Sequence, residues 1–139
     1  MRIFLDANIL FSASADGSAT GLLLDAILKY ADECITCPHA FEEARRNIET
    51  KRPQQSSGLK RIIKNISLSN AFYTDLPVDL PQQDIPILAG AIGAQCTHLW
   101  TSDKKHFGPL YGKSIHGVQI VSSLLLVDIL IDLGWRPRF

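Results

Sequence analysis

The 139-residue sequence has no excess of charge and no long apolar run. Its 14 Lys and Arg residues balance 14 Asp and Glu residues, so the net charge points to no particular partner. The most apolar stretch, residues 124–133, is interrupted by Asp128 and Asp132 and is shorter than the roughly 20 apolar residues of a membrane-spanning helix. The apolar run at residues 3–5 is too short for the core of a signal peptide. We therefore expect a cytoplasmic protein with no membrane partner.

Cysteine is also scarce, and its odd number, three, fits a reducing compartment. Cys34 and Cys37 have C-x-x-C spacing, but no second pair of nitrogen or sulfur ligands completes a zinc site. A redox pair would normally begin a helix, whereas this segment itself resembles a strand, in which positions three apart point to opposite faces. We interpret the cysteines as small apolar packing residues.

The composition is that of a soluble globular protein, with 46% hydrophobic, 20% charged and 8% aromatic residues. It excludes a disordered chain, a collagen and a coiled coil. The length fits one domain over residues 1–139.

Short apolar strands alternate with amphipathic helices along the chain. Apolar runs predict strands at residues 2–5, 33–36, 66–68, 98–101 and 117–121. Helical spacing predicts helices at residues 19–31, from residue 38 onward, and at 59–64, 84–95 and 122–134, with loops at 7–18 and 53–58. This alternation predicts an α/β domain with a parallel sheet, and in such sheets ligands bind beyond the carboxyl ends of the strands.

Acidic residues stand at the ends of predicted strands and at the start of a predicted helix. Asp6 ends the first strand, Asp103 follows the fourth, and Asp84 begins a helix. Taken singly, each has an ordinary role as a turn or cap residue, and Glu42 and Glu43 would lie on a solvated helix face. Taken together, the acids would meet at one edge of the sheet and repel one another unless a cation neutralised them. Oxygen ligands without a Cys/His cluster favour Mg²⁺ or Mn²⁺.

Four blocks of the sequence resemble the signature blocks of PIN domains, in the family's order and at its spacing over essentially the whole chain. They are residues 5–10 (LDANIL), 40–48 (AFEEARRNI), 84–89 (DIPILA) and 101–107 (TSDKKHF). The resemblance implies a three-layer α/β/α fold with a central five-stranded parallel sheet. It also implies a metal-dependent endoribonuclease, most often a VapC-like toxin, with an antitoxin protein as a partner and a homodimer as a common assembly.

The resemblance further implies roles for individual residues. The acidic cluster would be Asp6, Glu43, Asp84 and Asp103, with polar support from Asn8 and from Thr101 or Ser102. Asp6 and Asp103 would contact the metal, Asp84 directly or through water, and Glu43 would orient the nucleophilic water or a second ion. Cleavage would leave 5′-phosphate and 3′-hydroxyl ends.

Two points of this assignment stay open. The preference for Glu43 over Glu42 rests on the resemblance alone, because both flank the buried stripe of their helix at similar angles. Some relatives carry a further acid where this chain has Lys104, Lys105 and His106, so one or two metal ions are both compatible with the pattern.

Basic residues are concentrated between residues 45 and 64, where the only acid is Glu49. Such a local excess is typical of phosphate contacts, and also of a helix face that is simply solvated. We expect His106, close to Asp103, to touch a phosphate or to have a local structural role. The residues expected to bind RNA are Arg45, Arg46, Lys51, Arg52 and Lys104.

Two alternatives remain. The first is a non-catalytic PIN-like module that binds RNA or a partner protein. The second is a phosphatase of the haloacid dehalogenase type, which would need a second aspartate where this chain has Asn8. The apolar last helix is explained mostly by core packing, with a subunit or antitoxin contact as the lesser interpretation.

Overall fold

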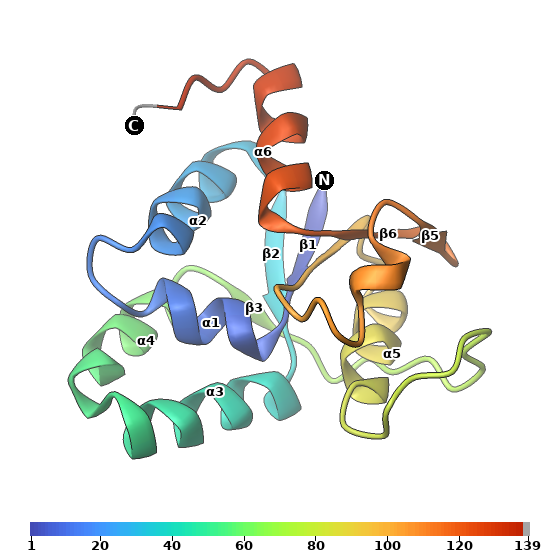
Figure 1. Ribbon diagram of the computed structural model, residues 1–139, viewed down its shortest axis with the longest axis horizontal. Coiled ribbons are helices and arrows are strands. Elements are labelled where there is room, and N and C mark those ends of the chain that lie inside the picture. The colour runs from blue at the N-terminus through green and yellow to red at the C-terminus, as the bar shows by residue number, and fades with distance from the viewer. Residues whose placement is uncertain (138–139) are drawn as a thin grey trace.

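The computed structural model describes residues 1–137, whose helices and strands alternate along the chain (Figure 1). In chain order they are β1 (Arg2–Leu5), α1 (Ala7–Ala13), α2 (Ala19–Tyr30), β2 (Glu33–Thr36), α3 (Pro38–Lys51), α4 (Ser56–Ile63), β3 (Ser67–Leu68), α5 (Ile85–Gly93), β4 (His98–Trp100), β5 (Ser114–Ile115), β6 (Val118–Val121) and α6 (Ser123–Asp132). Short 3₁₀ turns lie at Pro53–Gln55 and Gly108–Leu110. Within the described range, no helix has both the length and the apolar character needed to cross a bilayer.

The strands form one sheet in the order β3-β2-β1-β4-β6-β5. The first five in this order are parallel, as expected, and β5 pairs antiparallel with β6 at one edge. The central strand β1 is apolar on both faces because both faces are covered: Ile3, Phe4 and Leu5 are each 0% exposed.

Helices cover the sheet on two sides. In Figure 1, α1, α2, α3 and α4 lie to one side of β1 and β2, and α5 lies to the other. The packing of α5 is close because Gly90 faces the ring of Phe4, which a Cβ atom at position 90 would approach to 3.2 Å. This arrangement is the three-layer α/β/α architecture that the PIN-domain resemblance implies.

The structure corrects the expectation of loops at residues 7–18 and 53–58. Residues 7–13 form α1, whose buried face includes Ile9, Leu10 and Ala13. Seven residues are too few to show a helical period clearly, and packing stabilises so short a helix more than intrinsic propensity does. In the second loop, α4 begins at Ser56, earlier than predicted.

The sheet also contains one strand that the sequence analysis missed. Residues 114–115 form β5, which pairs with β6 through Ile115 and Val118. The two residues between the strands, His116 and Gly117, have φ angles of 48° and 82°. Positive φ at both central positions is the requirement of a tight hairpin turn, which reverses the chain and adds an antiparallel edge strand to a parallel sheet.

Candidate metal centre

The site begins where two neighbouring strands end side by side. Strand β1 pairs with β4 so that Leu5 lies opposite Trp100, and the next residues of the two strands are Asp6 and Thr101. The backbone N–H of Asp6 donates to the carbonyl of Trp100 at 3.1 Å, which continues the pairing one step further. Two polar side chains are thereby fixed at the carboxyl edge of the sheet, where α/β proteins bind their ligands.

The carboxylate of Asp6 is buried, with 4% of the residue exposed. Its Oδ1 accepts from the backbone N–H of Ala7 at 2.7 Å, which caps α1, and its Oδ2 accepts from the hydroxyl of Thr101 at 2.7 Å. Burial raises the pKa of Asp6 to about 6, and the nearby negative charges of Glu43 and Asp84 raise it as well. The two hydrogen bonds act in the opposite direction and lower it. The carboxylate is thus held in place, and the two neighbouring charges that act on it, those of Glu43 and Asp84, are both negative.

Asn8 and Thr101 connect Asp6 to the segment that carries Asp103. The Asn8 side chain accepts from the backbone N–H of Ser102 at 3.0 Å and donates to Asp6 Oδ2 at 3.3 Å. The Thr101 hydroxyl also accepts from the backbone N–H of Asp103 at 3.1 Å. Of the two alternatives expected beside Asn8, Thr101 contributes its side chain, whereas Ser102 contributes its backbone N–H and is exposed.

Asp84 occupies the N-cap position of α5 without capping it. Its side chain makes no capping hydrogen bond, although Asp84 directly precedes the helix and Pro86 lies in the first turn. The residue is 8% exposed, and burial raises the pKa of its carboxyl group despite the adjacent imidazole of His106. An aspartate at this position ordinarily caps the helix, but capping does not explain the orientation of the Asp84 side chain.

His106 joins Asp84 and Asp103. Its Nδ1 lies 2.8 Å from Asp84 Oδ2 and 2.9 Å from Asp103 Oδ2. One ligand atom from each of the three residues lies within 4.8 Å of the others, the spacing of groups that share a metal ion. From the sequence, His106 is expected close to Asp103, three residues away. The contact with Asp84 brings together residues 22 positions apart, which no sequence spacing indicated.

Helix α3 contributes a row of side chains to the hollow that the acids surround. Glu43, Asn47 and Lys51, spaced four residues apart, line it, so they share one helix face. Glu42 points elsewhere and forms an ion pair with Arg45 at 2.7 Å. Asn47 was not among the expected site residues, although its spacing of four from Glu43 places it on the same helix face.

All four acids of the predicted cluster border one hollow of about 290 Å³. They come from four separate segments: the end of β1, the middle of α3, the start of α5 and the loop after β4. The side chains that line it include those of Asp6, Asn8, Phe11, Ser12, Glu43, Asn47, Lys51, Gln83, Asp84, Asp103 and His106. The cationic groups among these are Lys51 and, when protonated, His106, so acidic charge predominates.

The other residues expected to bind RNA do not line this hollow. Arg45 pairs with both Glu42 and Glu49 and lies against a different depression beside α4. Arg46 donates to the carbonyl of Glu42 and Arg52 to that of Lys51, and both are exposed. Lys104 is exposed and directly follows Asp103.

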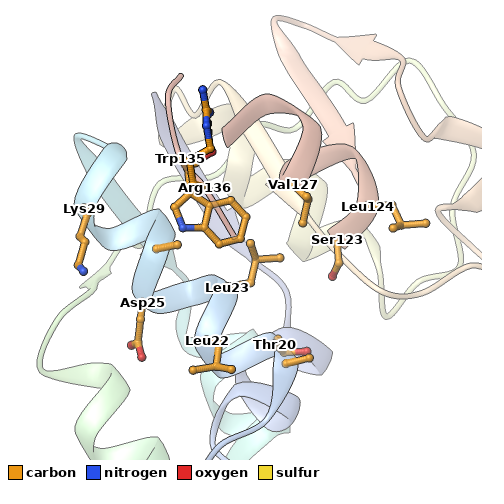
Figure 2. Close-up of a pocket in the computed structure, with 12 residues that line it drawn as sticks. Thr20, Leu22, Leu23, Asp25, Lys29, Ser123, Leu124, Val127, Trp135 and Arg136 are labelled. Atoms are coloured by element: carbon orange, nitrogen blue, oxygen red, sulfur yellow. Dashed lines mark hydrogen bonds between the residues drawn. The ribbon is translucent and has the colours of Figure 1, made fainter. Parts of the chain in front are cut away.

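A larger hollow, of about 590 Å³, lies away from the acids (Figure 2). Side chains of α2, α6 and the C-terminal segment surround it, among them Leu23, Val127 and Trp135. Its lining is mainly apolar and contains no cluster of acids. The convergence of carboxylates, rather than the size of the hollow, therefore marks the candidate site.

The three cysteines are buried and free, as their interpretation as packing residues requires. Burial raises the pKa of the Cys34 thiol to about 12 and that of Cys96 to about 11. These two thiols are therefore unreactive at neutral pH.

Replacing Thr101 by valine should loosen the site. The change keeps the shape of a fully buried side chain but removes the hydroxyl that bonds Asp6 and the Asp103 backbone. We expect unfolding to become about 2 kcal/mol easier and metal affinity to fall about tenfold. Chemical denaturation and titration with Mn²⁺ measure the two effects. Thr101→Ser, which retains the hydroxyl, should recover most of both, and equal losses in the two variants would contradict the role given to the hydroxyl.

Comparison with known proteins extends the description of the fold. No protein-family model matches the sequence, and the search of curated proteins found no match. Among solved structures, the chain resembles one from a crystal structure of VapBC2 from Rickettsia felis bound to a DNA fragment from their promoter. The TM-score is 0.65 at 17% sequence identity, over 88% of this chain and 98% of that chain. At this identity the similarity establishes a shared fold, in agreement with the PIN-like architecture expected from the sequence.

Proposed function

We propose that the protein is a divalent-metal-dependent endoribonuclease. The observation that carries the proposal is the convergence of Asp6, Glu43, Asp84 and Asp103 on one hollow. Asp6 and Asp84 are both buried, and the pKa of each is raised, so the folded chain leaves its carboxylates short of positive charge. A divalent cation supplies that charge, and carboxylate-rich oxygen sites suit Mg²⁺ or Mn²⁺.

The position of each residue in the hollow suggests its role. Asp6, Asp84 and Asp103 hold the ion, while Asn8 and Thr101 fix the carboxylate of Asp6 through hydrogen bonds. The ion, when bound, supplies a nucleophile at neutral pH and stabilises charge on the phosphoryl group. Glu43, which lines the same hollow from α3, would orient the attacking water. Attack at phosphorus would break the bond to the 3′ oxygen, leaving a 5′-phosphate and a 3′-hydroxyl that takes up a proton.

RNA is the proposed substrate, on the strength of the PIN-domain resemblance together with the phosphate-binding groups near the acids. Lys51 lies in the hollow itself, and Lys104 follows Asp103. Arg46 and Arg52 are exposed on and just beyond α3, within the same basic segment. These cations would contact the phosphates of a polyanionic strand bound across the acids.

We further propose that the nuclease is a cytoplasmic toxin of a type II pair, held by an antitoxin protein. Support comes from the PIN-domain resemblance and from the fold shared with a chain of the VapBC2 assembly. Co-expression with the product of a neighbouring small gene, followed by purification of a complex, tests the partnership separately from the chemistry.

The direct test of the chemistry is cleavage of a mixed-sequence RNA, with DNA of the same sequence as the matched substrate. We expect cutting of RNA in Mg²⁺ or Mn²⁺, none in EDTA, and 5′-phosphate ends on the products. RNA binding without cutting would favour a non-catalytic module. Release of phosphate from a phosphomonoester without strand cutting would favour a phosphatase.

Lys51 and Arg45 offer a matched pair for the RNA-binding surface. Lys51→Gln removes the lysine that lines the hollow, whereas Arg45→Gln removes an arginine already paired with Glu42 and Glu49. We expect RNA affinity at low salt to fall about fivefold for Lys51→Gln, with a shallower dependence on salt concentration, and to change little for Arg45→Gln. Fluorescence anisotropy in EDTA measures binding without cleavage. Equal losses for the two variants would contradict this division and point to a broader basic surface.

A further inference from the structure

The position of His106 is set by the turn that follows β4. Its backbone N–H donates to Asp103 Oδ1 at 3.1 Å, and the next residue, Phe107, is fully buried and donates its N–H to the Asp103 carbonyl at 2.9 Å. The backbone that carries the imidazole is thus tied to Asp103, and the imidazole lies between the carboxylates of Asp84 and Asp103.

The atoms of this contact are shielded from solvent but are not joined by well-directed hydrogen bonds. Within residues 1–137, Asp84 Oδ2 and His106 Nδ1 are buried, and neither has a hydrogen bond of acceptable geometry, although they lie 2.8 Å apart. Asp84 as a whole is 8% exposed. A buried carboxylate oxygen and a buried ring nitrogen that face each other in this way are both left with bonding capacity.

Their separations match those of ligands around one ion. Two ligand atoms at right angles, each about 2.1 Å from a metal, lie about 3.0 Å apart. The distances from His106 Nδ1 to the two carboxylate oxygens, 2.8 Å and 2.9 Å, are close to this value. The third separation, between the two carboxylate oxygens, is within 4.8 Å.

We propose that His106 Nδ1 is a direct ligand of the metal ion, together with Asp84 and Asp103, and that this nitrogen makes the site select Mn²⁺ over Mg²⁺. The inference rests on the metal site of the proposed function and adds a ligand to it. Mg²⁺ strongly prefers oxygen and retains its water, whereas imidazole is a good ligand for first-row transition ions. Replacing one oxygen ligand by a nitrogen ligand therefore lowers the affinity for Mg²⁺ more than the affinity for Mn²⁺.

Binding measurements on the full chain test the selectivity. We expect the wild-type protein to bind Mn²⁺ at least about tenfold more tightly than Mg²⁺. In His106→Gln, Mn²⁺ affinity should fall about tenfold, Mg²⁺ affinity should change much less, and the preference should largely disappear. His116→Asn is the control, because it removes an imidazole from the β5–β6 turn and leaves the hollow untouched.

Pulsed electron paramagnetic resonance of bound Mn²⁺ tests directly whether a nitrogen atom coordinates the ion. The measurement on the wild-type protein does not depend on whether a variant folds. We expect ¹⁴N modulation from a coordinated imidazole in wild type and in His116→Asn, and its loss in His106→Gln. Absence of nitrogen modulation from wild type, or an unchanged Mn²⁺/Mg²⁺ ratio in His106→Gln, would overturn the inference. Nitrogen-coordinated Mn²⁺ without RNA cleavage would support the ligand and reject the nuclease, whereas absence of metal binding would reject both.

Discussion

Asp6→Asn is expected to abolish RNA cleavage and, in the same protein, to raise the melting temperature of the metal-free chain. Activity should fall by about a thousandfold or more, because the substitution removes the charge of a carboxylate that we propose helps to hold the metal ion. The opposite effect on stability follows from burial, since the wild-type carboxylate is 4% exposed and its pKa is raised from 3.8 to about 6. At pH 7.5 the folded protein must keep this group ionised in a poorly solvated place.

The sign and size of the stability change can be worked out from this shift. A group whose pKa is higher in the folded than in the unfolded state stabilises the fold below its unfolded pKa, and that contribution is lost as the pH rises through the folded value, here about 6. The upper limit at neutral pH is about 3 kcal/mol. Asparagine keeps the bond from Ala7 N–H but disturbs the arrangement around Thr101, so we expect a gain of about 1–2 kcal/mol, or a few degrees.

Thermal denaturation in EDTA at pH 7.5 and pH 5 measures this effect, and the advantage of Asp6→Asn should shrink at the lower pH. Asp128→Asn, an exposed acid on α6 outside the hollow, is the matched control and should change neither activity nor stability. A lower melting temperature for Asp6→Asn than for wild type would show that the Asp6 carboxylate stabilises the fold, which would contradict this prediction. Full cleavage by the folded variant would remove Asp6 from the mechanism.

Gly58→Ala is expected to destabilise the protein severely, although alanine is the better helix former. A Cβ atom at position 58 would lie 1.9 Å from the carbonyl oxygen of Ser14 and 2.8 Å from its carbonyl carbon. These are backbone atoms at the end of α1, so no side chain can rotate away to relieve the clash. We expect a loss of at least about 3 kcal/mol, which outweighs the gain of about 1 kcal/mol in helix propensity.

Denaturant titration in EDTA measures this loss, with Gly108→Ala as the control, because a Cβ there would come no closer than 3.8 Å to Lys104 Cβ. Displacement of α4 should also disturb α1, whose first turn carries Asn8, so metal affinity should fall with stability. Wild-type stability of Gly58→Ala would mean that α4 does not pack against α1 in this way.

Much of the architecture was predictable from local pattern. The five parallel strands were each expected close to their observed positions, because short apolar segments between helices are characteristic of parallel strands, although the edge strand β3 proves to be exposed. α1 and β5 were missed for a common reason: each is short, and its stability comes from partner elements rather than from a pattern within its own few residues. For α1 these partners are α2, α3 and α4, and for β5 the partner is β6, reached through a two-residue turn with positive φ.

The candidate site, like the fold, was predictable in part from the sequence and in part only from the tertiary structure. The sequence by itself determined which acids stand at strand ends and at a helix start, because those positions follow from periodicity and from the chemistry of turns and caps. Only the tertiary structure placed Glu43 rather than Glu42 against Asp6, turned Arg45 toward its own helix, and brought His106 between Asp84 and Asp103. The physical reason is that strand pairing and helix packing set the distances between segments, and neither is encoded in the spacing of residues along one segment.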